Sequence, residues 1–336
     1  MDILNAAVAL ANFVLIPAMA YGSQLALGAL GVTLVYGILR FSNFAHGDTM
    51  AMGTMATILV TWALQKAGVS LGPVPTALLA IPFGIAFAAA LVLVTDRAVY
   101  RFYRAQRAKP VILVIVSMGV MFIYNGLTRF IIGPDDQDFA DGARFLISAR
   151  DFKAATGLEE GLAIRSTQAL TVVTAVVVVA LLFWFLNRTR TGKSMRAYSD
   201  NEDLALLSGI NPEKVVVVTW VIVAALATVA GVLYGLDKSF KPFTYFQLLL
   251  PIFAAAIVGG LGNPLGAIAG GFVIAFSEVG VTYAWKKVVA YAAPGGWEPE
   301  GLLQLLGTDY KFAVSFMILI AVLLFRPTGL FKGKSV

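Results

Sequence analysis

The chain has 336 residues, of which 59% are hydrophobic and only 13% are charged, and its mean hydropathy is +0.83. A soluble domain carries about 25% charged residues, so this composition excludes an ordinary soluble protein and indicates an integral membrane protein. The net charge of +6 does not indicate nucleic-acid binding, because the basic residues flank the apolar runs. The absence of cysteine excludes disulfides, thiolate metal sites and a cysteine nucleophile.

Long apolar runs predict one all-α, polytopic transmembrane bundle over residues 1–336, with about eight to ten helical segments. A β-barrel is not expected, because its strands are short and alternate in hydrophobicity. The N-terminus lacks the basic region of a cleavable signal peptide, so the first helix is expected to be retained. The predicted spans are 3–21, 22–39, 48–66, 74–95, 111–132, 167–187, 214–236, 248–261, 264–284 and 310–325.

The segment 248–284 is interrupted by the run Gly259-Gly260-Leu261-Gly262-Asn263-Pro264. It fits either two tilted spans or two half-helices that meet inside the membrane. Broken backbone at membrane depth is tolerated only where it is buried in protein or faces a cavity. Broken or re-entrant helices are therefore part of the predicted fold.

The distribution of Lys and Arg predicts the orientation of the chain. Basic residues concentrate in 96–110, in 188–214 and in the tail, which carries Arg326, Lys332 and Lys334, and all three are expected in the cytoplasm. The acidic segment 133–166 is predicted as a periplasmic loop, and 285–309 as a second outside loop. Counting the spans then predicts that both termini are cytoplasmic.

The most informative stretch is Arg40-Phe41-Ser42-Asn43-Phe44-Ala45-His46-Gly47-Asp48, which lies between two apolar runs and holds the only histidine. Polar residues at membrane depth are expensive and mark functional sites. Gly47 permits a sharp turn, Asp48 is suited to cap the next helix, and the free N–H groups of that helix start attract an anion. The alternative is that Asp48 is only a cap and His46 only a packed residue. One histidine without cysteine leaves few ligands for a metal, so no metal site is expected.

The glycine series around Gly259 provides a second candidate. Gly262, Gly266 and Gly270 follow the small-xxx-small spacing that lets helices approach closely, so packing is the preferred interpretation for Gly266 and Gly270. Transporters often contain repeats whose broken helices meet at the substrate site. We therefore predict that two sets of residues line the translocation path: Asn43, Phe44, His46, Gly47 and Asp48, and Gly259, Gly260, Gly262 and Asn263.

Glu278 lies within an apolar run and fits either the pathway or the outer membrane interface, of which the interface is preferred. No nucleotide site is expected. Gly192-Lys193-Ser194 lacks the earlier glycine of a P-loop, and the stretch from Gly329 to Gly333-Lys334-Ser335 has the wrong spacing. No catalytic grouping of serine, histidine and acid is evident, so the chain is not expected to be an enzyme.

The cytoplasmic segment 188–213 is longer than a connection requires. Ser199 or Asp200 is predicted to cap a short helix with Glu202 and Asp203 in its first turn, and Gly209 to end it. Leu204, Leu207 and Ala205 give this helix an apolar face suited to a partner's groove. The alternative is a solvated surface helix.

Three stretches resemble the permeases of bacterial branched-chain amino-acid (Liv-type) ABC importers. Residues 30–48, with Asn43-Phe44-Ala45-His46-Gly47, are similar to the signature region of that family. Residues 259–267 resemble its second glycine-rich motif, which sugar permeases share loosely. Residues 203–209 resemble the loop that engages the ATPase, although they depart from the Glu-Ala-Ala form of other importers. The resemblance covers nearly the whole chain, and the acidic loop 133–166 is long for the family.

The resemblance implies a multi-pass permease subunit in the bacterial inner membrane. Its implied partners are a second related permease subunit, two cytoplasmic ATPases that bind ATP and Mg²⁺, and a periplasmic binding protein; no cofactor is expected in this chain. The resemblance raises the expectation that residues 43–48 line the path and that 199–212 couple to the ATPase. The implied substrate is leucine, isoleucine, valine or a related amino acid, with urea or short amides as the alternative. An ion-coupled secondary transporter or channel is the alternative of another class, and a membrane enzyme has less support.

Overall fold

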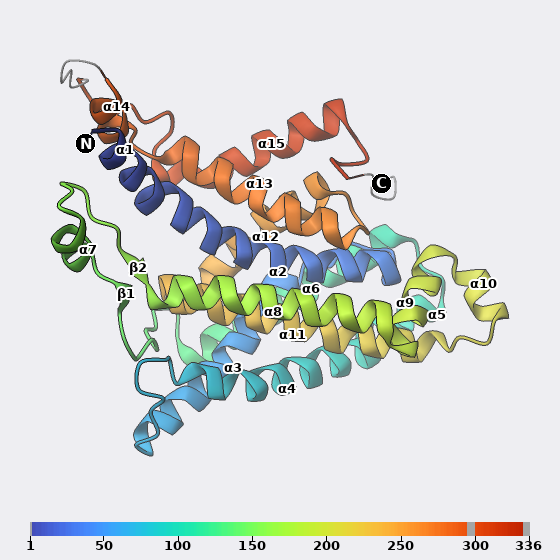
Figure 1. The fold of residues 1–336 in the computed structure, drawn as a ribbon. Coiled ribbons are helices and arrows are strands. Elements are labelled where there is room, and N and C mark those ends of the chain that lie inside the picture. Colours follow the sequence, from blue (N-terminus) through green and yellow to red (C-terminus); the bar gives the residue numbers. More distant parts are fainter. Residues whose placement is uncertain (1, 294–299, 332–336) are drawn as a thin grey trace.

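The computed structural model describes residues 2–293 and 300–331 and shows an elongated bundle of long helices (Figure 1). Among the described residues, eight helical runs are long and apolar enough to cross a membrane. The helices that form the bundle are α1 (Asp2–Leu10), α2 (Ile16–Leu39), α3 (His46–Lys66), α4 (Ala77–Thr95), α6 (Pro110–Ile132), α8 (Ser166–Arg188), α11 (Pro212–Lys238), α12 (Pro242–Gly259), α13 (Pro264–Thr282) and α15 (Lys311–Phe325).

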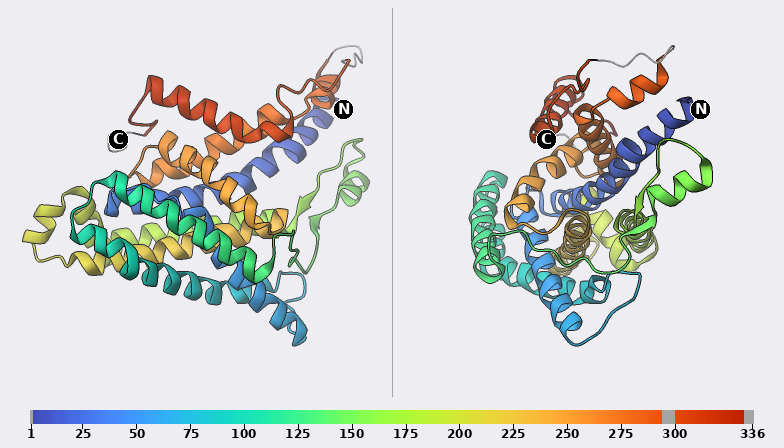
Figure 2. Two further views of the ribbon diagram at one scale, coloured as in Figure 1. Left: turned by 180° about the vertical axis from the view of Figure 1, so that it is seen from behind. Right: turned by 90° about the vertical axis from the view of Figure 1, so that its left-hand side faces the viewer.

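Shorter elements lie at the two ends of the bundle (Figures 1 and 2). One end, which we name the α10 end, carries α5 (Arg101–Ala105), α9 (Arg190–Asp200) and α10 (Glu202–Leu207). The opposite end, the α7 end, carries α7 (Ala149–Thr156), α14 (Lys286–Ala292), and β1 (Phe145–Ile147) paired antiparallel with β2 (Ile164–Arg165). Among the described residues, the predicted grouping of 96–110 with 188–214, and of 133–166 with 285–293 and 300–309, is confirmed.

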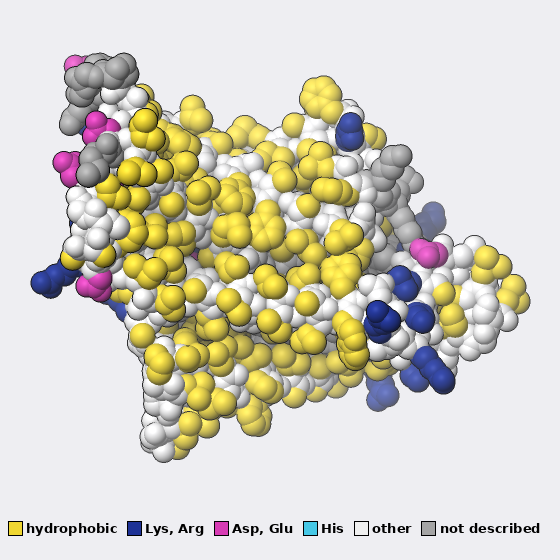
Figure 3. Space-filling view, in the orientation of Figure 1, with side chains coloured by type: hydrophobic (Ala, Val, Ile, Leu, Met, Phe, Trp, Pro, Cys, Tyr) yellow, Lys and Arg dark blue, Asp and Glu magenta, His cyan; other side chains and the backbone are white. Residues whose placement is uncertain are grey.

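The charge distribution follows the same division (Figure 3). Hydrophobic side chains cover the middle of the visible face, whereas Lys and Arg gather at the α10 end. The tail residues Lys332 and Lys334 lie outside the described residues.

The predicted division of residues 3–39 into two spans is wrong. Residues 2–39 form one helical run of 38 residues, with a π-helical turn over Ala11–Leu15. Gly22 does not break it, since this glycine provides close packing: a Cβ there would lie 2.5 Å from a ring carbon of Phe272 on α13. At 1.5 Å per residue the run is about 57 Å long, well beyond the roughly 30 Å of a bilayer core.

The prediction that both termini are cytoplasmic requires both chain ends to lie at one end of the bundle. The described chain ends instead lie at opposite ends of the bundle (Figure 1). The side chains of Asn5 and Asn12 accept hydrogen bonds from the backbone N–H groups of Glu160 and Ala163 at the α7 end, at 3.3 and 2.9 Å. Phe331 lies at the other end, where its carbonyl accepts from Asn263.

The segment 248–284 forms two antiparallel helices of 18 and 19 residues, not two half-helices that meet at mid-depth. α12 begins at Pro242, earlier than predicted, because proline is favourable in the first turn of a helix. Its internal Pro251 does not end the helix. The connecting turn lies at the α10 end, where residues 262–265 and Ser199 border one cavity.

At the α7 end, Asp141 fastens the acidic loop to the start of α4. Its carboxylate accepts the backbone N–H of Thr76 at 2.7 Å and the Thr76 hydroxyl at 2.6 Å. Burial raises the pKa of Asp141, but the hydrogen bonds from Thr76 outweigh this effect, so the pKa lies below its ordinary value.

This contact predicts a local dependence on pH. Because the carboxyl has a lower pKa in the folded chain than in the unfolded chain, its contribution is complete above about pH 3.9, the ordinary aspartate pKa, and is lost as the pH falls through the folded value. Hydrogen exchange at the Thr76 amide should therefore show protection that declines below that range. Asp141→Asn should remove this pH dependence, and an unaltered profile in that variant would contradict the assignment.

Candidate functional site

The chain breaks between α2 and α3 and then turns back into the bundle. Arg40 ends α2 in the left-handed conformation, with φ of 59°, and its guanidinium donates to the carbonyl of Ser199 on α9. Ser199 in turn donates from its hydroxyl to the carbonyl of Gly37 at 3.1 Å. The end of α2 is thus fastened to α9.

α3 begins inside the bundle. His46, its first residue, is fully buried and lies beside the backbone of Gly31, more than two turns before the end of α2. A Cβ at Gly31 would lie 2.4 Å from Cε1 of His46, so glycine is needed for this ring to fit. The segment between the helices therefore re-enters the bundle, as predicted for a broken helix.

Asn43, and not Asp48, organises the turn into α3. The Asn43 side-chain oxygen accepts the N–H of Ala45 at 3.1 Å and the Tyr100 hydroxyl at 3.3 Å. α3 starts two residues before Asp48, and Ala45 is its N-cap without a side-chain bond. The predicted cap at Asp48 is wrong.

Asp48 and Gly47 have other roles inside α3. Asp48 is buried, and one carboxylate oxygen accepts from the side-chain amide of Asn125 on α6 at 2.8 Å. Gly47 does not form a sharp turn: it is helical, and a Cβ there would lie 2.6 Å from the carbonyl oxygen of Tyr245. Its small size allows α12 to approach.

Phe44 is the partly exposed member of this first set. Its N–H donates to the Ser117 hydroxyl at 3.0 Å, and its ring lies 5.2 Å from that of Phe253 on α12. Asn43, His46, Gly47 and Asp48 are buried behind it.

Replacing His46 tests whether this set acts in transport. We expect His46→Ala to lower transport more than it lowers the amount of folded, assembled subunit, measured by uptake and by size-exclusion chromatography of the same preparation. His46→Gln keeps polarity and much of the volume and should retain more of both. An equal loss of folded subunit and uptake in His46→Ala would indicate that the ring serves packing alone, as expected when a buried side chain leaves a cavity.

The glycine run forms a tight turn between α12 and α13. Gly260 and Gly262 have φ of 110° and 82°, which favour glycine. Asn263 caps α13 by accepting the N–H groups of Leu265 and Gly266 at 3.1 and 3.2 Å. The backbones of Gly259 and Gly266 pack so closely that a Cβ on Gly259 would lie 2.0 Å from the Gly266 carbonyl oxygen.

The two predicted pathway sets do not lie at one place. Phe44 in the break before α3 contacts Phe253 of α12, and Gly47 in the first turn of α3 contacts Tyr245 in the first turn of α12. Gly262 and Asn263 instead share the lining of a cavity of about 430 Å³ with Ser199 and Asp200 of α9. The glycine turn is thus placed beside the predicted coupling segment.

In the predicted coupling segment, the cap of the short helix lies one residue after Asp200, the later of the two predicted positions. Ser199 and Asp200 end α9, and Asn201 caps α10 by accepting the N–H of Leu204 at 3.0 Å. Asn201 has an extended backbone and a short side-chain acceptor, which suit the cap position. Glu202 and Asp203 fill the first turn as predicted.

α10 presents leucines to solvent. Leu204 and Leu207 are 61% and 85% exposed, and Leu206 is also exposed. Ala205 does not belong to this face, because it is buried. Gly209, with φ of 78°, follows the helix, and Ile210 folds back to donate its N–H to the Ala205 carbonyl at 3.0 Å.

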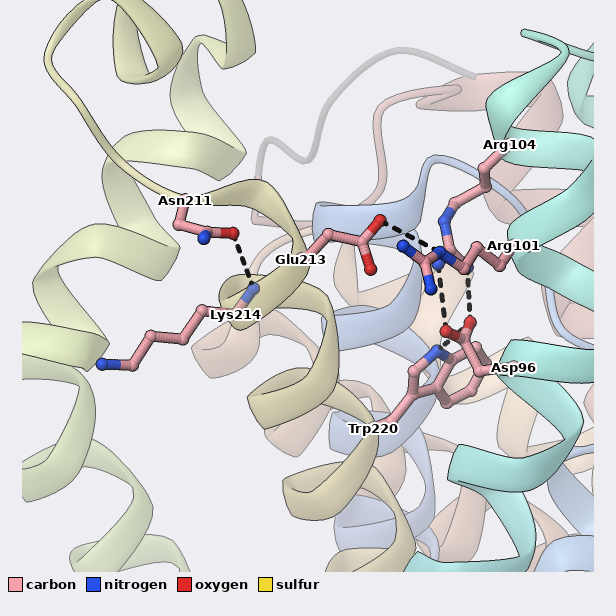
Figure 4. A network of polar contacts seen from close by, with 7 residues as sticks. All are labelled: Asp96, Arg101, Arg104, Asn211, Glu213, Lys214 and Trp220. Carbon is pink, nitrogen blue, oxygen red and sulfur yellow. Dashed lines mark hydrogen bonds and ion pairs between the residues drawn. The ribbon is translucent and has the colours of Figure 1, made fainter.

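A buried network beside this segment was missed by sequence reasoning (Figure 4). Asp96 is 3% exposed and accepts hydrogen bonds from both terminal nitrogens of Arg104 and, at 2.7 Å, from the indole of Trp220. An exposed ion pair between Arg101 and Glu213, at 3.6 Å, lies nearby. Asp96 was not recognised as a candidate functional residue in the sequence, because it stands at the border of a basic loop.

Glu278 lies one turn before the end of α13 and is buried inside the bundle, and its place at the outer membrane interface stays a prediction. Its side chain is 1% exposed, accepts from the Ser315 hydroxyl and lies against Tyr21. The neighbouring helices α2 and α15 cover it, which the sequence of α13 alone does not show.

A helical membrane bundle with a re-entrant break and an exposed leucine helix at one end defines a multi-pass transport protein of the permease class. The family model "Branched-chain amino acid transport system / permease component" matches residues 14–323, and the chain belongs to this family.

Three relatives are similar over almost their whole lengths. The branched-chain amino acid permease BraD of Pseudomonas aeruginosa is 31% identical over 94% of each chain. LivH of Escherichia coli K12 is 31% identical over 92% of this chain and 91% of its own. A probable LivH of Methanocaldococcus jannaschii is 27% identical over 93% and 90%. No solved structure matches the chain.

Proposed function

We propose that this chain is the permease subunit of an ABC importer that carries branched-chain or related amino acids across the bacterial inner membrane. BraD and LivH, named as high-affinity branched-chain amino acid permeases, support the substrate class. The chain itself performs no catalysis; ATP and Mg²⁺ bind to partner ATPases.

The exposed face of α10 is the observation that carries the partner assignment. Leucines at 61% and 85% exposure are unfavourable in water and suit an apolar groove. The helix is joined to the bundle, because Tyr198 on α9 donates to Glu202 at 2.6 Å and Arg40 binds the carbonyl of Ser199. A force on α10 therefore reaches the end of α2.

The remaining partners follow from the orientation. The α10 end carries the gathered Lys and Arg and is assigned to the cytoplasm by the positive-inside rule. The α7 end then faces the periplasm and meets a substrate-binding protein. A second related permease subunit completes the pathway, and residues 43–48 line the part contributed by this chain.

Purification of the tagged subunit from its native membrane in mild detergent tests the assembly. Co-purification of P-loop ATPases and a second polytopic subunit, with ATP-dependent uptake of labelled leucine by proteoliposomes, is the expected result. If the proteoliposomes take up urea but not leucine, the chain is instead assigned to the transport of amides. An ATPase-free homo-oligomer that transports with an ion gradient would contradict the importer assignment.

A further inference from the structure

We propose that Asp96 is a positioning residue that connects the α10 end of α11 to the broken segment before α3. The inference rests on the proposed function, because it names the residues through which motion of α10 reaches the predicted pathway. None of Asp96, Tyr100, Arg104 and Trp220 belongs to the sites considered above as pathway or docking residues.

The first connection joins α10 to Trp220. α10 ends at Leu207, and α11 begins five residues later at Pro212, capped by Asn211, whose side chain accepts the N–H of Lys214 at 3.2 Å. Trp220 lies two turns into α11 and is 1% exposed. Displacement of α10 is thus transmitted along a short turn into a buried indole.

The second connection is a π-helical turn whose first and last residues both contact this indole. Residues Asp96–Tyr100 form this turn between α4 and α5. Asp96, at its start, accepts the indole N–H, while Tyr100, at its end, stacks on the same indole with 5.5 Å between ring centroids and 15° between planes. π-helical turns are rare and frequently lie at functional sites.

The third connection leads from Tyr100 to the broken segment. The Tyr100 hydroxyl donates to the Asn43 side-chain oxygen at 3.3 Å, and this oxygen also accepts the N–H of Ala45, the N-cap of α3. The Phe41 ring also packs against Tyr100, with 5.5 Å between ring centroids. Four contacts therefore join the Asp96 carboxylate to Ala45 at the start of α3.

Arg104 fixes the orientation of the Asp96 carboxylate. A buried carboxylate is unfavourable unless it is paired and hydrogen-bonded. The Arg104 fork donates one hydrogen bond to each oxygen of Asp96, and the oxygen Oδ1 also accepts the indole N–H. Figure 4 shows these side chains converging between α5 and α11. The carboxylate thus orients both the loop before α6 and the indole of α11.

The test uses the complete importer in proteoliposomes and measures ATP hydrolysed per amino acid transported. Trp220→Phe keeps the aromatic ring and removes the N–H to Asp96; Tyr100→Phe keeps the stack and removes the hydroxyl to Asn43. Each variant should assemble and hydrolyse ATP without substrate, yet the ATP used per molecule transported should rise about tenfold. This change is equivalent to about 1.4 kcal/mol, the order of one hydrogen bond.

The chain offers matched controls at the α7 end. Trp285→Phe removes an indole hydrogen bond to the Gly280 carbonyl at 2.9 Å, and Tyr291→Phe removes a hydroxyl bond to Glu160 at 3.1 Å. Both should keep the wild-type ratio. An unchanged ratio in Trp220→Phe and Tyr100→Phe, or uptake that falls only in proportion to assembled complex, would overturn the proposal. Failure of the proposed function itself would be recognised separately, because the wild-type subunit would then purify without ATPases.

Discussion

Replacing Asp203 by Lys together with Leu207 by Asp is expected to abolish uptake while the subunit still inserts into the membrane. Leu207 is 85% exposed and suited to an apolar groove, where a new carboxylate would be buried without a partner. An uncompensated buried charge costs about 3–5 kcal/mol, so we expect uptake to fall by more than about a hundredfold.

Uptake of labelled leucine and co-purification of the ATPase should fall together in this double variant. Leu146→Asp is the matched control, because Leu146 is 66% exposed in β1 at the opposite end. It should leave the ATPase bound. Wild-type uptake by the double variant would show that α10 is a solvated surface helix without a docking role.

Gly259→Val is expected to destabilise the packing of α12 on α13. A Cβ at this position meets the backbone of Gly266 at 2.0 Å, and backbone atoms cannot move aside as a flexible side chain does. Overpacking of a close contact costs about 1–3 kcal/mol, and the helices must separate to admit two further methyl groups. We expect a lower melting temperature in detergent and little folded protein in the membrane.

Gly126→Val on α6 provides the comparison. A Cβ at Gly126 has no heavy atom within 4 Å, so valine is accommodated in open space. Thermal unfolding followed by fluorescence-detected size-exclusion chromatography should separate the two variants clearly. Equal melting temperatures would mean that α12 and α13 pack less closely than the structure shows.

The sequence was sufficient for the class of fold and for the locations of most helices. Apolar runs of about 20 residues are a direct consequence of bilayer thickness. The basic loops indicate which connections lie at the same end of the bundle. The predicted division of 3–39 into two spans was wrong. A long apolar stretch that contains Gly22 is compatible both with two spans and with one helix that projects beyond the membrane. Only the packing of Gly22 on Phe272 distinguishes these cases.

The start of α3 was misplaced for a similar reason. An aspartate that follows a glycine resembles a helix cap, yet Asp48 lies inside the helix because Asn125, 77 residues later, supplies its hydrogen bond. The cap of α10 was displaced only from Ser199 or Asp200 to Asn201, since Ser, Asp and Asn are all good cap residues. Local propensity leaves such choices open.

The sequence by itself determined that this is a helical membrane protein with a polar break near residue 43 and a leucine-bearing helix near residue 204. These features depend on composition and short spacing, which physical chemistry connects directly to membrane insertion and exposed apolar surface. Only the tertiary structure decided which polar groups meet. Asp96 and Trp220, 124 positions apart, form one hydrogen bond, and the glycine turn lies beside α9 and not beside His46, because such contacts depend on the packing of whole helices.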